Sequence, residues 1–221
     1  MAFDQSTVMV VSMNATLRVL ALDLLGGHPV LDFINTLDWR GRDPAAGGAT
    51  ECLDSYDALL AWARRLAVIE PGEAKALAQA ARQDPAGAAA MTQAARELRE
   101  AVHALIAAAH VKQKPQPADL ACLNRWLDAA PARLAAKAGG YVWSAGSGAG
   151  GLGLPLSRLA HLAAELLTAD QLRRVACCAG PGCGWLFLDT SPNRRRRWCS
   201  MEGCGNRAKA KRHYRRVKAQ D

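Results

Sequence analysis

The chain has 221 residues, of which half are hydrophobic and 5% aromatic, and its formal net charge is +8. This size suits one large domain, or a medium domain with a small one, and the alanine-rich, aromatic-poor composition favours closely packed helices. The charge lies at one end. Residues 173–221 hold 13 Lys and Arg against 3 Asp and Glu, whereas residues 1–172 hold 15 against 17.

Three classes of protein are excluded on this basis. An odd number of cysteines, 7, argues against a secreted disulfide framework. No apolar run approaches the roughly 20 residues of a transmembrane helix. The first residues carry Asp4 and lack the basic start of a secretion signal. We therefore expect a cytoplasmic, reducing environment, and we expect residues 1–17 to be a loose leader.

The body of the chain is expected to be mainly α. Residues 18–28 suggest a short extended piece and a turn, and a helix should begin at about Pro29. A loop over 41–50 should follow. The glycine-rich segment 139–153 predicts one short strand at Tyr141–Trp143 and then a flexible loop. Apolar residues at three- and four-residue spacing predict helices over 54–69, 72–83, 86–112, 118–129 and 155–169. Together these elements predict an N-terminal helical domain over residues 18–172.

Four cysteines behind this domain form two equally spaced pairs, Cys178-x4-Cys183 and Cys199-x4-Cys204. Four thiolates complete the tetrahedron that zinc prefers and leave no open position, which predicts one structural Zn²⁺. A segment this small has too little apolar material to fold without a metal or a disulfide. Cys177 offers a second register, Cys177-x5-Cys183, and ordinary buried cysteines are the alternative to a metal site.

The C-terminal module over 173–221 is predicted to be a small zinc-binding β-hairpin plus helix, resembling a treble clef. Residues 185–188 and 194–198, joined by the turn-prone residues 189–193, suggest the hairpin. A basic helix should follow Cys204. Its narrow apolar face of Ala210, Tyr214 and Val217 is expected to dock on the zinc module.

The positive charge of this module predicts binding to nucleic acid, because clustered cations on an ordered platform gain affinity for phosphates by counterion release. Arginine can also fork onto phosphate oxygens or guanine edges. A solvated charge run is the plainer alternative. The candidate nucleic-acid-binding residues are Arg194, Arg195, Arg196, Arg197, Arg207, Lys209, Lys211, Arg212, Arg215 and Arg216.

Two strings resemble known bacterial families. The string CGWLFLDTSPNRRRRWCSMEGCGNRAKAKRHYRR resembles the CGNR zinc finger, named for the tetrad that stands here at 204–207. The segment GGHPVLDFINTLDWR, with the helices that follow, is similar to the ABATE domain. The resemblance implies zinc at the same four cysteines. It also implies a stress-induced transcription regulator, with a helical sensing domain and a DNA-binding finger.

A pocket for a small effector is one interpretation of the polar groups near residue 35. Asp32, Asn35 and Thr36 interrupt an apolar stretch, and we expect Trp39, Arg40 and Trp62 as neighbours in the wall of such a pocket. Capping and internal hydrogen bonding around a turn are the plainer interpretation. Paired carboxylates, a nucleophile with its base, a phosphate loop and an HExxH string are all missing from the sequence. We therefore expect no enzymatic activity.

The leading hypothesis is a zinc-dependent DNA-binding transcription regulator whose helical front end senses a signal or forms a homodimer. Basic zinc modules also serve in RNA or ribosome association, which is the first alternative. The second alternative is a protein-interaction adaptor whose cations meet an acidic partner. Duplex DNA is the favoured partner because the family resemblance points to it.

Overall fold

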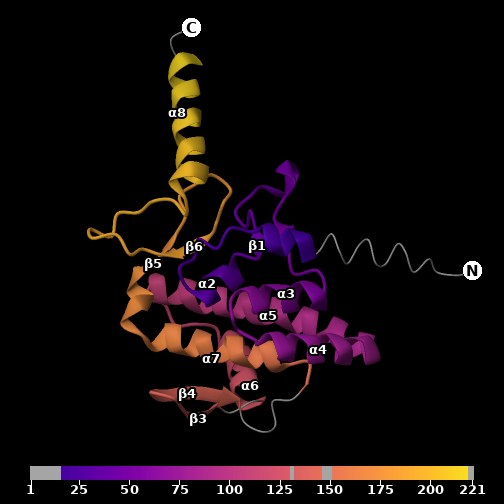
Figure 1. Cartoon of the computed structure of the whole chain (residues 1–221). Helices are drawn as coiled ribbons and strands as arrows, with labels where there is room; N and C mark the ends of the chain where they lie inside the picture. The colour runs from indigo at the N-terminus through magenta and orange to yellow at the C-terminus, as the bar shows by residue number, and fades with distance from the viewer. Residues whose placement is uncertain (1–15, 130–131, 146–150, 219–221) are drawn as a thin grey trace, which may run out of the picture. The chain divides into compact units, whose positions relative to one another are not determined.

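The computed structural model describes residues 16–129, 132–145 and 151–218, and Figure 1 shows them as a mainly α structure, as predicted. The contacts divide the chain into two compact units. We call residues 16–22 with 53–169 the helical unit, and residues 23–52 with 170–218 the cysteine unit. The predicted boundary near residue 172 lies close to one break. The predicted domain over 18–172, however, is not a single compact unit, because its residues 23–52 belong with the cysteines.

The helical unit contains the five helices that were predicted, and each is confirmed within four residues at each end. Local signals start them: Ser55 accepts a hydrogen bond from Ala58 N, Asp84 accepts one from Gly87 N, and Glu70 and Glu73 form a capping box. The helices are α3 (Tyr56–Arg65), α4 (Pro71–Gln83), α5 (Pro85–His110), α6 (Pro117–Ala129) and α7 (Leu154–Thr168).

The core of this unit lies where α5 packs against α3, α6 and α7. Its fully buried side chains include Trp62, Leu98, Ile106, Leu156 and Leu159, which recur at helical spacing along their elements. The apolar faces that the sequence predicts are therefore the ones that the fold buries.

A β-hairpin of β3 (Ala132–Lys137) and β4 (Gly140–Ala145) follows α6. The predicted strand at Tyr141–Trp143 is confirmed as part of β4. Its partner β3 was not predicted, because an alanine-rich run favours helix on propensity alone. Gly139 makes the turn with a φ of +79°, which suits a residue without a side chain. The loop predicted after this strand includes residues 146–150, which lie outside the described residues.

The first described residues, 16–21, are helical, so the extended piece predicted there is wrong. Arg65 explains the helix: its guanidinium donates to the carbonyl oxygens of Leu20 at 2.9 Å and Leu22 at 2.7 Å. These bonds satisfy carbonyls that a helix end leaves unpaired. Most of the predicted leader, residues 1–15, falls outside the described residues.

Short elements make up the cysteine unit. They are α2 (Pro29–Ile34), β1 (Leu37–Asp38), η1 (Pro44–Ala46), β2 (Thr50–Glu51), η2 (Asp170–Arg174), β5 (Val175–Cys177), β6 (Leu186–Leu188), η3 (Met201–Gly205) and α8 (Asn206–Lys218). The helix predicted from Pro29 is confirmed as α2, with His28 Nδ1 accepting from Val30 N. Strands β1 and β2 pair antiparallel, and β5 pairs antiparallel with β6.

The predicted hairpin between 185–188 and 194–198 is wrong. Strand β6 pairs with β5, with Val175 opposite Leu188 and Cys177 opposite Leu186. Residues 189–200 form a loop because Asp189 holds it as a series of turns. The Asp189 carboxylate accepts hydrogen bonds from Ser191 N and Oγ and from Arg196 N, and Arg194 adopts a φ of +48°. A hydrogen-bonded turn of this kind competes with a strand ladder.

Among the described residues, no helix combines the length and the apolar character required to cross a membrane.

Candidate metal centre and cationic surface

The four predicted cysteines come together in the cysteine unit. Cys178 follows β5, and Cys183 closes the turn before β6. Cys199 lies near the end of residues 189–200, which we call the arginine loop, and Cys204 lies in η3. All four are buried, and their Sγ atoms lie within 4.8 Å of one another. The Sγ of Cys199 is 3.8 Å from that of Cys183 and 3.6 Å from that of Cys204.

These distances fit zinc. A tetrahedron with Zn–S bonds of about 2.3 Å has sulfur atoms about 3.8 Å apart, so the four thiols need little movement to close on one ion. Cys177 is exposed, and its Sγ lies 3.9 Å from the carbonyl oxygen of Cys178 instead of facing the cluster. The register with Cys177 is therefore wrong, and the four-cysteine set is confirmed. The arrangement is that of one structural zinc, with every position of the tetrahedron taken by the chain.

Backbone and guanidinium groups surround the sulfur atoms. Cys178 Sγ accepts from Gly180 N at 3.4 Å and from Cys199 N at 3.3 Å, and Cys204 Sγ accepts from Arg207 at 2.9 Å. Hydrogen bonds from the neighbouring thiols, together with the two backbone bonds, lower the pKa of Cys178. Such donors stabilise the thiolate form that a metal requires.

Residues 23–52 supply further contacts within the cysteine unit. The Asn35 side chain donates to Leu186 O at 2.9 Å and accepts from Leu186 N at 2.9 Å, so that it pairs with β6 as a strand would. Asp38 Oδ1 accepts from the indole N–H of Trp185 at 2.8 Å. The carbonyl oxygen of Gly26 accepts from Leu188 N at 2.8 Å. The C-terminal cysteines therefore lie in a unit that also includes residues 23–52.

Trp39 joins the same segment to the metal centre. The guanidinium carbons of Arg42 and Arg207 lie 4.0 Å and 4.8 Å from the Trp39 ring centroid, distances typical of cation–π contacts. Arg207 also donates to Cys204, so one side chain contacts both the indole and a ligand sulfur. Sequence patterning did not indicate the contacts of Asp38 with Trp185 and of Trp39 with Arg207, because these partners lie far apart along the chain.

The predicted effector residues have structural partners instead. Asp32 Oδ1 accepts from Gly26 N at 2.8 Å, and the Thr36 hydroxyl donates to Phe33 O at 2.6 Å. Arg40 donates to Ile34 O at 3.4 Å, while Trp62 belongs to the helical unit and is fully buried. Trp39 lines one of the hollows described below, whereas the other predicted residues, Asp32, Asn35, Thr36, Arg40 and Trp62, line none of them. The plainer interpretation of this stretch, capping and internal hydrogen bonds, is the one that matches these contacts.

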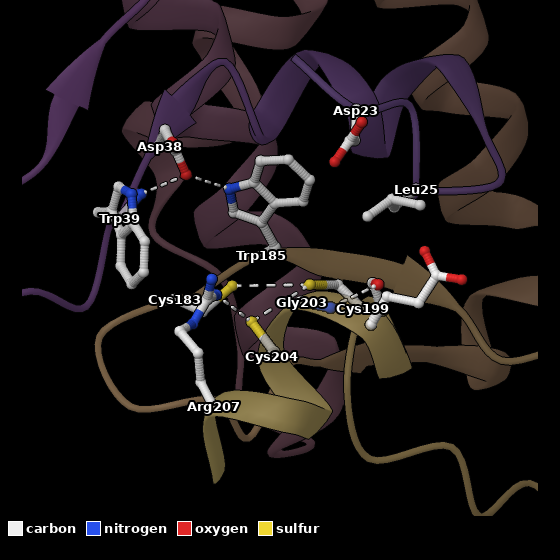
Figure 2. A pocket seen from close by; sticks show the side chains of 12 residues that line it. Asp23, Leu25, Asp38, Trp39, Cys183, Trp185, Cys199, Gly203, Cys204 and Arg207 are labelled. Atoms are coloured by element: carbon white, nitrogen blue, oxygen red, sulfur yellow. Dashed lines mark hydrogen bonds between the residues drawn. The ribbon is translucent and has the colours of Figure 1, made fainter. Parts of the chain in front are cut away.

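A hollow of about 250 Å³ opens onto the cysteine cluster. Figure 2 shows the sulfur atoms of Cys183, Cys199 and Cys204 on one side of it and the indoles of Trp39 and Trp185 on the other. Its remaining lining residues are Asp23, Leu25, Asp38, Ser200, Glu202, Gly203 and Arg207. Three of the four metal ligands therefore border a space that a small molecule can enter.

The four consecutive arginines, Arg194–Arg197, differ in whether their side chains have partners within the protein. Arg196 turns inward: its Nε donates to Trp198 O at 3.1 Å, its terminal nitrogen donates to Cys199 O, and its guanidinium lies 4.3 Å from the Phe187 ring centroid. Arg194, Arg195 and Arg197 are exposed. Of the predicted nucleic-acid residues, Arg196 and Arg207 therefore have internal partners in the structure.

Helix α8 presents the remaining cations, since Lys209, Lys211, Arg212 and Arg216 are exposed. The side chain of Arg215 lies outside what the structure describes. The predicted docking of the apolar stripe is wrong, because Tyr214 is 68% exposed and Val217 is 46% exposed. The helix contacts η3 at its start, and Figure 1 shows its later turns extending away from that contact.

A groove of about 540 Å³ lies between the arginine loop and α8. Four cations border it, and no acidic residue does. Trp198, which is half-buried and lies 5.4 Å below the Arg197 guanidinium, adds an aromatic wall. The full lining is Ala179, Pro181, Arg197, Trp198, Ala208, Lys211, Arg212 and Arg216.

The helical unit has a separate hollow of about 720 Å³ among α3, α4 and α5. Alanines 78, 81, 88 and 89 line it together with polar residues that include Asp54, Thr92 and Arg96. The Oδ1 atom of Asp54 is buried there without a hydrogen-bond partner among the described residues. Sequence patterning did not single out these residues, because each also suits an ordinary helix surface.

Two family models match consecutive stretches of the chain. Residues 174–217 match the model of the CGNR zinc finger, and residues 27–170 match the ABATE model, described as "Putative stress-induced transcription regulator". The comparison with curated proteins gives no match. The ABATE match spans well over half of the chain and precedes the finger in the predicted order. The chain therefore belongs to the ABATE family and carries a CGNR zinc finger behind the ABATE region.

Proposed function

We propose that this protein is a non-enzymatic transcription regulator that binds duplex DNA through the exposed cations of its zinc-organised unit. The groove between the arginine loop and α8 carries the proposal. Arg197, Lys211, Arg212 and Arg216 border it without an acidic neighbour in the lining. Such a surface gains affinity for a phosphate backbone by releasing condensed counterions.

The zinc ion supplies rigidity when it is bound, and the chain's own residues supply the contacts. Cys199 and Cys204 tie the end of the arginine loop to the start of α8, because both are ligands of the same cluster. Cations held on a fixed platform lose less conformational entropy on binding than cations on a free tail. An exposed basic helix also has the dimensions of the major groove.

DNA binding by the full-length, zinc-loaded chain tests the proposal directly. We compare the double variant Lys211→Gln/Arg212→Gln with a matched control, Lys75→Gln/Lys112→Gln, whose lysines are exposed in the helical unit. With about six phosphate contacts, the affinity should fall about 10³-fold between 50 and 200 mM salt. The groove variant should lower the log–log salt slope by about two, and the control should leave it unchanged.

The other functions give different results in the same assay. If the groove variant and the control lost equal affinity for DNA, the groove would not be the binding surface. Structured RNA that competes more strongly than duplex DNA would assign the protein to RNA or ribosome association. An adaptor would keep its affinity for nucleic acid when residues 194–197 are all changed to glutamate.

A sensing role for the helical unit is supported by its own hollow, whose volume lies in the range of small-molecule sites. Its lining combines alanines with the polar residues Asp54, Thr92 and Arg96, which suits a ligand that has both apolar and polar groups. Replacing Ala88 with leucine should narrow the hollow and reduce any ligand-induced rise in melting temperature. A homodimer is the further part of this proposal, and sizing chromatography with light scattering tests it.

A further inference from the structure

The four cysteines differ in the hydrogen bonds that their sulfur atoms receive from nitrogen. Cys178 Sγ accepts hydrogen bonds from two backbone N–H groups, and Cys204 Sγ accepts one from the Arg207 guanidinium. Cys183 has a backbone hydrogen bond from Trp185. Among the described residues, no nitrogen donates to Cys199 Sγ, whose partners are the neighbouring thiols alone.

The cysteines also differ in access. Cys183, Cys199 and Cys204 border the hollow of about 250 Å³, whereas Cys178 does not. Figure 2 shows the Cys199 sulfur beside those of Cys183 and Cys204 and below the indole of Trp185. An N–H···S hydrogen bond withdraws charge from a thiolate and lowers its nucleophilicity. Cys199 thus combines access from the hollow with the least shielded sulfur of the cluster.

We propose that Cys199 is a modification site: the thiolate of the metal centre that reacts first with small electrophiles and hydroperoxides entering through this hollow. This inference goes beyond DNA binding and does not depend on it. It concerns the metal ligands themselves and is read out by their chemical modification.

The reaction with hydrogen peroxide balances within the cluster. The Cys199 thiolate attacks one peroxide oxygen, so that an S–O bond forms, the O–O bond breaks and hydroxide leaves with the electron pair. The Cys204 thiolate, 3.6 Å away, then attacks the oxidised sulfur. An S–S bond forms and a second hydroxide leaves. Two thiolates lose two electrons in total, and one peroxide gains them.

Loss of two of the four thiolates would release the bound ion, since two sulfur ligands do not complete its coordination. An oxidant would thus destabilise the cationic surface of the cysteine unit, which the bound ion holds in place. Cys177 offers an internal contrast, because it is exposed but stands outside the cluster.

Limited alkylation of the full-length, zinc-loaded protein tests the proposal. Iodoacetamide is added below stoichiometry, and peptide mass spectrometry identifies the first modified cysteine. We expect Cys199 to be alkylated about tenfold faster than the other three ligands. First modification at Cys178, Cys183 or Cys204, or equal rates at all four, would overturn the proposal.

A variant separates hydrogen-bond shielding from general loosening. Arg207→Gln removes the donor to Cys204, so Cys204 alkylation should rise about tenfold while Cys178 and Cys183 keep their rates. A uniform rise at all four ligands would mean that Arg207 acts only on stability, and the shielding argument would fail. With peroxide, a chromophoric zinc chelator should record one ion released for each Cys199–Cys204 disulfide. A first disulfide that contains Cys177 or Cys178 would contradict the assignment.

Discussion

The side-chain amide of Asn35 and the backbone of Leu186 exchange two hydrogen bonds of 2.9 Å each, across 151 residues of sequence. Through them a residue of the ABATE region takes the place of a strand beside β6. The strand lies directly after Cys183, so this pair fixes one wall of the metal centre. The ABATE and CGNR regions are consecutive in sequence, but residues 23–52 of the first fold with the second.

Asn35 should therefore be required for the metal centre. Asn35→Ala leaves the buried N–H and C=O of Leu186 without partners, which should destabilise the cysteine unit by about 1–3 kcal/mol. Zinc loss to a competing chelator should accelerate accordingly. Asn193→Ala, in the exposed part of the arginine loop, is the control and should behave as wild type. Unchanged zinc loss in Asn35→Ala would mean that the segment merely rests on the finger.

Arg196 and Arg195 should separate stability from binding. Arg196→Ala removes two hydrogen bonds and the contact with Phe187, so the free energy of unfolding of the cysteine unit should fall by about 1–3 kcal/mol. Arg195→Ala should leave stability unchanged and reduce the salt slope of DNA binding by at most about one. Denaturant unfolding followed by tryptophan fluorescence, together with a salt titration, measures both. Equal stability of the two variants would refute the inward role of Arg196.

Gly180 should tolerate no side chain. A Cβ atom there would lie 2.8 Å from Cys204 Sγ, closer than such atoms approach, and 3.3 Å from Cys178 Sγ, which is a tight contact. Gly180→Ala should therefore displace ligand sulfur atoms and lower the zinc affinity by about 10- to 100-fold. Gly72→Ala, where a Cβ meets no atom within 4 Å, is the matched control and should bind zinc normally. Competition with a chelator of known affinity gives the comparison.

The ion pair of Glu73 and Arg158 should give the helical unit a pH dependence. Arg158 donates to both carboxylate oxygens of Glu73 at 2.6 Å, and this hydrogen bond is the main reason that the pKa of Glu73 is lowered. A lowered carboxyl pKa contributes stability above the unfolded-state value of about 4.3, and this contribution is lost as the pH falls through the folded-state pKa.

Glu73→Gln should thus cost about 1 kcal/mol at pH 7, a figure limited by solvent screening of the half-exposed pair, and the difference should shrink below about pH 4. Thermal unfolding between pH 3 and 7 measures it. Glu97→Gln, whose carboxylate is more exposed and lies 3.8 Å from Arg125, is the control with a smaller effect. A difference that grows toward low pH would have the wrong sign for this mechanism.

Removing the metal should affect the two units differently. The cysteine unit is built around the four ligand cysteines, so we expect it to depend on the ion, whereas α3–α7 share an apolar core. After chelation, hydrogen exchange should accelerate in residues 23–52 as well as in 170–218 and stay slow in the helices. Continued protection of residues 23–52 without metal would contradict the assignment of that segment to the cysteine unit.

Local patterns predicted the helices because each one depends on residues within a few turns of itself. Apolar spacing gave α3 to α7, and Pro29 marked the start of α2. The same local reasoning failed for β3, whose alanines favour helix until β4 pairs with them. It also failed for the apolar stripe of α8, because the presence of Tyr214 and Val217 on one face does not provide a surface to cover them.

The sequence by itself determined the four metal ligands, the family and the end of the chain that carries the charge. The spacing of the cysteines was sufficient to predict the ligands, because two short loops can each supply two thiolates. The location of the positive charge follows from counting charged residues along the chain. Only the tertiary structure decided that β6 pairs with β5 and Asn35, and that Arg196 and Arg207 turn toward internal partners. These outcomes depend on which groups the fold brings together. An arginine is a free surface cation or a donor to internal groups according to which carbonyls, sulfur atoms and rings lie beside it.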